Sequence, residues 1–498
     1  MFRTLTKSRR SPRRCSSQLR YENLETRRLM AADITYNAAS DEVAVVGTDL
    51  ADHIVIENEQ VIAGWTYQNG QLRPLYSNGI RVTVRDLQGN LRQDSQGNPL
   101  DETFTSWSVQ RVRVDALNGT DTVENETNVR STLIGGGDRD ILRGGSNDDI
   151  IWGEGGNDSI YGGTGNDVLN GGADNDTLHG NGGNDTYLFL GGSYYSLPAD
   201  QVFTIDEGTD TIYELANSDA DTLDFGGVSE GITIDLADTG SSRFQQVHDG
   251  LVLRLMNSNG LENVEGTPYN DTIRGNGRPN RIDAGYGSDT LEGRGGDDRL
   301  DGSRGRDFYV FGDDATGDDE VFDYYLDGAR NRLDFRDHAT GITLDIDTEA
   351  WQQVSSSLRL RLDHADTIKE VVGSDHADTI FGNYENNTIW GRAGGDTISG
   401  RDGNDTLYGN DGNDTLNGNG GHDSIYGHNG DDTLSGGSGN DYLSGGNGND
   451  TLTGNSGIDT LRGYAGDDSL FGDLDDSTVD GGTGWDYHRN ASWWFWWG

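Results

Sequence analysis

Over long stretches of the chain, one apolar side chain recurs every ninth residue, and most positions between are glycine or polar. In 403–446, each Leu or Ile at this period follows an Asp by two positions. A period of nine is neither the 3.6-residue period of a helix nor the alternation of a long strand. Numbering each unit so that Asp is position six predicts a glycine-rich turn over positions one to six. A three-residue strand then follows, and its middle side chain, at position eight, points inward.

Twenty-four such units form three arrays, at 135–188, 266–310 and 373–489. Asp occupies position six in all but three units, which carry Asn280, Asn387 and Ser477. Position eight is aliphatic or Tyr except at His488. Repeats of fixed short period are typical of solenoids, in which each unit buries its apolar face only against its neighbours. Two units per coil would place successive coils about 4.8 Å apart and stack the position-eight side chains into a thin core.

Two longer segments separate the arrays and are related to each other. The passages "DTLDFGGVSEGITIDL" from Asp221 and "NRLDFRDHATGITLDI" from Asn331 indicate an internal duplication. We therefore expect an all-β fold of parallel β-roll (β-solenoid) arrays joined by β-rich inter-array segments. The expected order is a basic export-like segment (1–32), a β-rich region that resembles a degenerate solenoid (33–134), array 1 (135–188), an inter-array segment (189–265), array 2 (266–310), the duplicate inter-array segment (311–372), array 3 (373–489) and a Trp-rich tail (490–498).

The composition sets a difficulty for this fold. The chain has 85 acidic and 37 basic residues, a formal net charge of −48, and only 32% hydrophobic residues. So polar and charged a chain does not collapse unless something offsets the repulsion. Its acidity argues against nucleic acid as a partner. The sequence contains no apolar run of 18 residues, which predicts no transmembrane segment, and a single cysteine, Cys15, cannot form a disulfide framework.

The position-six carboxylates explain how the repulsion is offset. Stacked about 5 Å apart on successive coils, two of them would repel by roughly 3 kcal/mol at an effective dielectric constant near 20. A calcium ion between coils reverses the sign, because it takes carboxylate and backbone carbonyl oxygens, and glycine-rich turns leave carbonyls available. Paired units allow about fifteen calcium ions at most, which would reduce the net charge to about −18. The candidate ligands are Asp140, Asp149, Asp158, Asp167, Asp176, Asp185, Asp271, Asp289, Asp307, Asp378, Asp396, Asp405, Asp414, Asp423, Asp432, Asp441, Asp450, Asp459, Asp468 and Asp486.

The unit that carries Asn280 departs from this pattern. It lacks the position-six carboxylate, so we expect it to be a spacer that binds no ion. Arg278 and Arg281 lie in the same unit and could supply the missing positive charge.

The units resemble the hemolysin-type RTX nonapeptide repeat G-G-x-G-x-D-x-U-x, over somewhat under half of the chain. The resemblance implies a parallel β-roll that binds calcium through the position-six Asp residues. A second resemblance lies at Leu24–Met30, "LETRRLM", which is similar to a Leu-Glu-Pro-Arg-x-Leu-Leu segment near the N-terminus of large exported bacterial proteins. Thr26 and Met30 depart from that pattern, and a basic run precedes it.

These features predict a secreted or extracellular calcium-binding protein of the cell surface or matrix, with no catalytic residues. The sequence contains no H-E-x-x-H, so the metalloprotease motif is absent. Two alternatives stay open. One is a calcium-dependent adhesin whose partners are cell-surface glycans or matrix. The other is a carbohydrate-active enzyme with its site in an inter-array segment.

Overall fold

The computed structural model describes residues 33–37, 42–47, 50–68, 71–86, 88, 90–93, 99–105, 109–190, 208–214, 219–239, 243–257, 260–323, 328–473, 476–490 and 493–497. The basic segment 1–32, with its export-like stretch Leu24–Met30, lies outside them. The described part is almost entirely β-strand, and its one helical element is the 3-10 turn η2 (Ala365–Thr367). None of its helical segments is long and apolar enough to cross a membrane.

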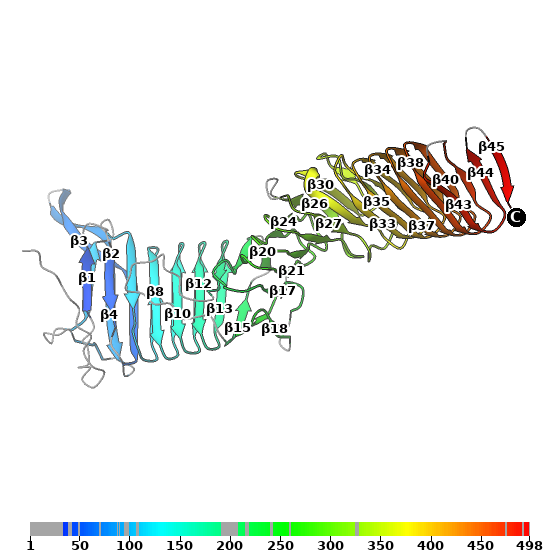
Figure 1. Cartoon of the computed structure of the whole chain (residues 1–498). Coiled ribbons are helices and arrows are strands. Elements are labelled where there is room, and N and C mark those ends of the chain that lie inside the picture. Colours follow the sequence, from blue (N-terminus) through cyan, green and yellow to red (C-terminus); the bar gives the residue numbers. More distant parts are fainter. Residues whose placement is uncertain are drawn as a thin grey trace, which may run out of the picture.

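The strands form four long sheets, which Figure 1 shows as an extended stack. Sheet 1 has fourteen strands, in the order β1 (Asp33–Asn37), β2 (Glu42–Val46), β6 (Arg111–Asp115), β8 (Arg130–Gly137), β10 (Ile150–Gly155), β12 (Val168–Ala173), β14 (Thr186–Leu188), β16 (Asp221–Asp224), β20 (Leu261–Glu265), β22 (Arg281–Asp283), β24 (Arg299–Asp301), β26 (Gly317–Phe322), β30 (Leu358–Leu362) and β29 (Gln352–Gln353). Sheet 2 has ten, in the order β18 (Gln245–Gln246), β19 (Leu251–Leu255), β15 (Gly208–Tyr213), β13 (Thr177–Gly182), β11 (Ser159–Thr164), β9 (Ile141–Ser146), β7 (Thr122–Asn125), β3 (Asp52–Gln68), β4 (Gln71–Asp86) and β5 (Asp101–Thr105).

Two further sheets continue the stack toward the C-terminus. Sheet 3 has twelve strands, in the order β17 (Thr233–Asp235), β21 (Thr272–Arg274), β23 (Thr290–Glu292), β25 (Phe308–Val310), β27 (Asn331–Asp334), β31 (Ile368–Val372), β33 (Thr388–Ala393), β35 (Thr406–Asp411), β37 (Ser424–Asn429), β39 (Tyr442–Asn447), β41 (Thr460–Ala465) and β43 (Thr478–Thr483). Sheet 4 has nine, in the order β28 (Thr343–Asp345), β32 (Thr379–Phe381), β34 (Thr397–Asp402), β36 (Thr415–Gly420), β38 (Thr433–Ser438), β40 (Thr451–Ser456), β42 (Ser469–Phe471), β44 (Asp486–Asn490) and β45 (Trp493–Trp497).

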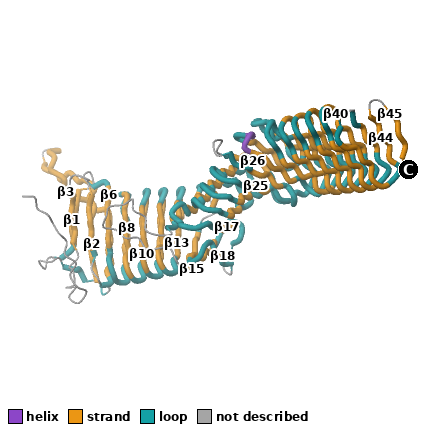
Figure 2. Tube along the Cα trace, viewed as in Figure 1, coloured by secondary structure: helices purple, strands orange, loops and turns teal. Residues whose placement is uncertain are grey.

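Within the arrays, each strand pairs in parallel with the strand 18 residues away. Ile150 of β10 lies opposite Val168 of β12, and Ile425 of β37 lies opposite Leu443 of β39. Successive strands of the chain alternate between two sheets, so two units make one coil. This confirms the predicted parallel β-roll. Figure 2 shows the turns collected along the edges of the stack.

The strands of arrays 1 and 3 are longer than the three residues predicted. Most span six residues, because the strand continues through positions one to three of the next unit and positions two and three also pair, as in β11. Only the position-one glycine is skipped in the register, as at Gly162 between Tyr161 and Gly163. A glycine-rich turn was expected here, but backbone without side chains can still join a ladder. In array 2 the strands keep the predicted length of three.

The position-eight side chains form a continuous core along the roll. In array 3 they are at most 1% exposed at Leu407, Leu416, Ile425, Leu434, Leu443, Leu452, Leu461 and Leu470. Each side chain packs against the equivalent side chain of the next coil, so the core is one residue wide on each face. Burial of a Leu or Ile side chain contributes about 1.5–3 kcal/mol.

The two inter-array segments each end one sheet and begin another. In the first, the antiparallel pair β18–β19 ends sheet 2 and β17 begins sheet 3. In the second, β29–β30 ends sheet 1 and β28 begins sheet 4. The two junctions repeat one contact, since Gln245 hydrogen-bonds the backbone N–H and carbonyl of Asp235, and Gln352 does so with Asp345. In Figure 1 the stack shifts and changes direction across this region.

Candidate metal sites

Each position-six Asp lies immediately before a strand or, for Asp486, at its first residue, and forms a hydrogen bond with a neighbouring coil. The backbone N–H of Asp396 donates to Asp414 Oδ1 (2.8 Å), and that of Asp414 donates to Asp432 Oδ1 (2.8 Å). The same hydrogen bond, between Asp residues 18 positions apart in sequence, recurs along both edges of the roll. We call these two rows the Asp ladders. All twenty predicted ligands are buried, with exposures between 0% and 7%, and each lies in one of the ladders.

The second oxygen of most of these carboxylates accepts no hydrogen bond. Among the described residues, the buried Oδ2 atoms in this state belong to Asp121, Asp140, Asp149, Asp158, Asp167, Asp176, Asp185, Asp221, Asp289, Asp298, Asp396, Asp405, Asp414, Asp423, Asp432, Asp441, Asp450, Asp459 and Asp468. Leaving a buried charged acceptor unsatisfied costs several kcal/mol unless the group is neutralised or bound. Repeated so many times at one position, the feature indicates a missing positive partner.

Position-one glycines create the space around these oxygens. A Cβ placed on Gly418 would lie 2.2 Å from Asp423 Oδ2 and 2.6 Å from the carbonyl oxygen of Gly436. A Cβ on Gly427 would meet the equivalent two oxygens just as closely. A carboxylate oxygen and a backbone carbonyl of the next coil therefore converge over a residue without a side chain. Such an all-oxygen donor set fits calcium, a hard cation that takes carboxylate and carbonyl ligands together.

The electrostatics of the ladders support the same conclusion. Burial raises the pKa of Asp140 and Asp158 to about 8 and that of Asp432 to about 7, and repulsion from neighbouring ladder carboxylates adds to this effect. The backbone N–H on Oδ1 lowers the pKa but does not cancel the burial. Near neutral pH these groups hold protons readily in the absence of a cation. A bound divalent ion would favour the ionised form.

Two predicted ligands differ from the rest. Both oxygens of Asp271 accept hydrogen bonds from Thr267, from its N–H (2.7 Å) and its hydroxyl (2.9 Å). Ser374 satisfies Asp378 in the same way. Each of these Asp residues belongs to the first unit of its array, with Thr or Ser at position two. Because their oxygens already have donors, these two carboxylates need an ion least.

The ladders also include acidic residues that are not among the twenty predicted ligands. The N–H of Asp121 donates to Asp140, that of Asp176 to Asp210, that of Asp185 to Asp221, and that of Asp298 to Asp319. The residues added are Asp52, Asp121, Asp210, Asp221, Asp298 and Asp319, with Asp476 replacing Ser477 opposite Asp459. The first six keep the Asp-x-apolar signal, as in Asp210-Thr-Ile and Asp319-Glu-Val. They were missed because the unit around each is lengthened or, for Asp298, because only Asn280 was considered as its partner.

Position five forms a second polar row beside each Asp ladder. The Oδ1 of Asn166 accepts from the backbone N–H of Asn184 (2.9 Å), and Asn404 accepts from that of His422 (2.7 Å). His422 then accepts through Nδ1 from the N–H of Asn440 (2.7 Å). Here the side chain of one coil binds the backbone of the following coil, opposite in direction to the Asp ladders. This row explains the preference for Asn and Asp at position five.

Where Asn replaces Asp, an arginine occupies the region. Arg294 donates from Nη1 to the carbonyl of Gly275, in the Asn280 unit (2.8 Å), and binds both oxygens of Asp235. Arg401 repeats this arrangement on Gly382, in the Asn387 unit, and on Asp345. A guanidinium thus binds the position-one carbonyl of a unit that lacks the carboxylate. Arg278 and Arg281, the residues expected in this role from the sequence, do not make this contact among the hydrogen bonds of the described residues, and Arg278 pairs with Glu262 (3.2 Å).

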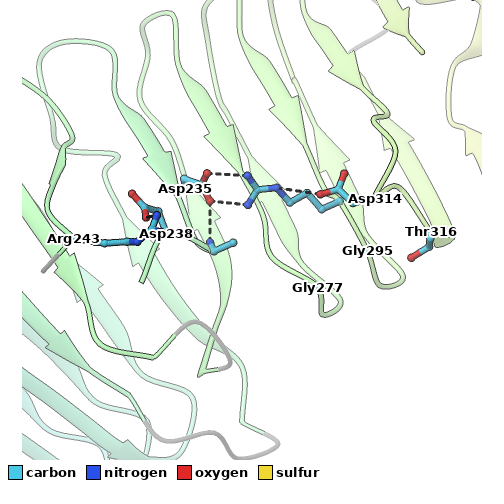
Figure 3. Close-up of a pocket in the computed structure, with 9 residues that line it drawn as sticks. Asp235, Asp238, Arg243, Gly277, Gly295, Asp314 and Thr316 are labelled. Atoms are coloured by element: carbon cyan, nitrogen blue, oxygen red, sulfur yellow. Dashed lines mark hydrogen bonds and ion pairs between the residues drawn. The ribbon is translucent and has the colours of Figure 1, made fainter. Parts of the chain in front are cut away.

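The first of these arginines, Arg294, lines an open pocket of about 730 Å³ where the first inter-array segment meets array 2. Figure 3 shows Asp235, Asp238 and Arg243 on one side and Asp314 on the other. The charged groups pair with one another, Arg294 with Asp235 and Arg243 with Asp238. The Arg294–Asp235 pair thus connects array 2 with the first inter-array segment across this pocket.

Comparison with known proteins agrees with this geometry. The family model of the RTX calcium-binding nonapeptide repeat matches residues 131–160, 152–187, 257–277, 274–309, 372–407, 408–443 and 444–479. A search of curated proteins finds no match to the chain. The matched ranges contain the stacked coils, the position-one glycines and most of the Asp ladders. The arrays of this chain are therefore RTX nonapeptide repeats, and the chain is a calcium-binding β-roll protein.

Proposed function

We propose that this chain is a secreted, non-enzymatic protein that folds as it binds extracellular calcium and serves as a structural element of the cell surface or matrix. The proposal assigns calcium to the Asp ladders, with the twenty sequence-predicted Asp residues as ligands and about fifteen ions at most. Residues 1–32 would act in export, and the inter-array segments 189–265 and 311–372 would join the arrays into one rod.

The observation that carries the proposal is the row of buried Oδ2 atoms without hydrogen-bond donors. Their desolvation disfavours the folded chain at neutral pH unless a cation binds between the coils. Binding free energy then becomes folding free energy, as in other small metal-dependent modules. A chain with a net charge of −48 and a core one residue wide has few other sources of stability.

The extracellular location follows from the strength expected of such sites. Each coil-to-coil site offers two carboxylates and carbonyls, and extracellular calcium modules bind in the range of about 10⁻⁴–10⁻³ M. Cytosolic calcium is far below this range, so the chain would stay unfolded until export. Outside the cell it would stiffen into the extended stack seen in Figure 1. A long solenoid with a repeating surface suits a spacing or scaffolding role.

A calcium titration followed by far-ultraviolet circular dichroism tests the proposal. The β signal should appear between about 0.1 and a few mM calcium. The double variant Asp414→Ala, Asp432→Ala should need more calcium and bind fewer ions by isothermal titration calorimetry. Asp402→Ala, Asp411→Ala is the matched control, because it removes two exposed acidic residues from the same array. A calcium-stripped chain with full β structure at pH 8, or a ladder variant that behaves like its control, would contradict the proposal.

A further inference from the structure

A cluster of three buried carboxylates lies where array 1 meets the first inter-array segment. Asp185 precedes β14, Glu214 follows β15, and Asp221 begins β16. They are 1%, 6% and 0% exposed. One carboxylate oxygen of each lies within 4.8 Å of the others. Two oxygens bound to one calcium ion at about 2.4 Å each are at most about 4.8 Å apart, so no pair of these oxygens is too far apart to share an ion.

The cluster is held by specific hydrogen bonds. The N–H of Asp185 donates to Asp221 Oδ1 (2.8 Å), as in the ladders. The hydroxyl of Tyr187 accepts from the N–H of Gly180 (2.8 Å) and donates to Glu214 Oε2 (2.7 Å). Glu214 is therefore fixed against the ladder pair by a fully buried tyrosine. The Oδ2 atoms of Asp185 and Asp221 are buried and accept no hydrogen bond.

A fourth acidic group adds to the charge of the cluster. The N–H of Asp221 donates to Glu262 Oε2 (3.2 Å). Arg278 is the ion-pair partner of Glu262, through its other carboxylate oxygen. The three ligands and Glu262 thus bring four carboxylates together at one buried junction, against one guanidinium at its rim.

The duplicate segment provides an internal comparison. Tyr309 takes the place of Tyr187 and again accepts from a position-one N–H, that of Gly302 (3.1 Å). Asn331 replaces Asp221 in the ladder, accepting from the N–H of Asp307 (2.8 Å). The side-chain amide of Asn331 donates to Asp323, which follows β26 as Glu214 follows β15. The second copy therefore has an amide–carboxylate hydrogen bond where the first copy has two carboxylates, Asp221 and Glu214.

At a second position, too, the second copy is less negatively charged than the first. Asp221 pairs with Leu261 and Asn331 with Ile368, so the following residues, Glu262 and Lys369, correspond. The second copy thus replaces two carboxylates of the first, by an amide and a lysine. Only the first copy retains the full set of anionic oxygens.

We infer that Asp185, Glu214 and Asp221 form a dedicated calcium site, separate from the two-carboxylate sites between array coils. Calcium affinity rises with the number of charged ligands and with the rigidity of the site. Three fixed carboxylates make this site the tightest of the chain, filled before the arrays. An ion here joins β14, β15 and β16, and so fixes the junction on which the next coils stack. This site extends calcium binding to two inter-array residues, Glu214 and Asp221, and shares Asp185 with the last ladder pair of array 1.

Calorimetric calcium titration of the full chain, with a chelator competition for the tightest step, tests the inference. Glu214→Gln keeps the shape of the side chain and should remove one calcium equivalent from the tightest class or weaken it by about tenfold or more. Asp323→Asn, at the corresponding cluster of the second copy, should leave that class unchanged. The pair Asn331→Asp, Lys369→Glu should add one tight equivalent, which tests the inference even if Glu214→Gln folds poorly.

The outcomes separate this site from the array sites. If Glu214→Gln binds calcium as the unchanged protein does, while Asp414→Asn, Asp432→Asn loses ions, the three-carboxylate site is wrong and the proposed function stands. If neither variant loses ions, both proposals fail. If Asn331→Asp, Lys369→Glu adds no tight calcium equivalent, that result also contradicts the inference.

Discussion

Acidification should replace calcium in folding array 3, since protonation and ion binding neutralise the same carboxylates. In this array burial raises the pKa of six ladder residues from an ordinary 3.8, to about 7 for Asp396, Asp405 and Asp432 and to about 6 for Asp423, Asp450 and Asp459. A folded pKa above the unfolded one favours folding below the unfolded pKa. That contribution is lost as the pH rises through the folded pKa. The calcium-free roll is therefore most stable below about pH 4 and loses this stability between about pH 4 and 7.

The free-energy cost of ionising these six carboxyl groups in the folded chain is large compared with the stability of a domain. Each unit of pKa shift corresponds to about 1.4 kcal/mol, so a shift to about 7 costs roughly 4 kcal/mol per ionised carboxyl and a shift to about 6 roughly 3. If the six groups were independent, the cost above pH 7 would be about 20 kcal/mol. Halved for screening by solvent near the roll edge it is about 10 kcal/mol. Typical domains have 5–15 kcal/mol in total, so the ionised array should not stay folded without a cation.

The assay is far-ultraviolet circular dichroism of calcium-stripped protein from pH 3.5 to 8.5. Light scattering is recorded in parallel, because the sequence pI is about 4.2. The β signal should rise as the pH falls from 7 toward 4.5, and adding calcium at pH 8 should restore the same spectrum. Asp414→Asn, Asp432→Asn removes two ionisable groups of similar shape and should shift the transition to higher pH. A calcium-free protein that is fully β-structured at pH 8, or unfolded throughout the range, would refute this reasoning.

Three further substitutions test other parts of the roll, the first by calorimetric calcium titration and the other two in calcium-saturated protein. In Gly409→Ala, the new Cβ would lie 2.1 Å from Asp414 Oδ2, so this variant should bind one calcium ion fewer and have a higher calcium midpoint. Gly277→Ala is the control: no atom lies within 4 Å of its Cβ, so the number of bound ions and the calcium midpoint should stay unchanged. Leu434→Ala should lower the free energy of unfolding by about 2–5 kcal/mol in urea titration, because its side chain is 1% exposed in the core; a change below 1 kcal/mol would contradict the single-file packing. Arg401→Ala removes a guanidinium that binds a backbone carbonyl and an Asp carboxylate, and should cost about 1–3 kcal/mol in the same assay; no loss would show that the guanidinium is not needed there.

The sequence by itself determined the repeating part of the molecule. Interactions in a solenoid are between neighbouring coils, so a period of nine with two units per coil fixes the 18-residue register, and Leu434 and Asp432 take their places from local order alone. The buried carboxylates and their need for a cation follow from the same period. The six-residue strands were not predicted, because the pairing of glycine backbone leaves no apolar signal.

Only the tertiary structure decided what happens where the period is broken. Asp210 and Asp221 enter the ladders 34 and 36 residues after their partners, and Asp319 enters 21 residues after Asp298, so no fixed spacing identifies them. Glu214 reaches its cluster through Tyr187, a contact that no repeat encodes. These placements depend on how far each insertion loops out before the chain returns to the stack. That distance is set by packing between segments distant in sequence, so the order of residues does not show it directly.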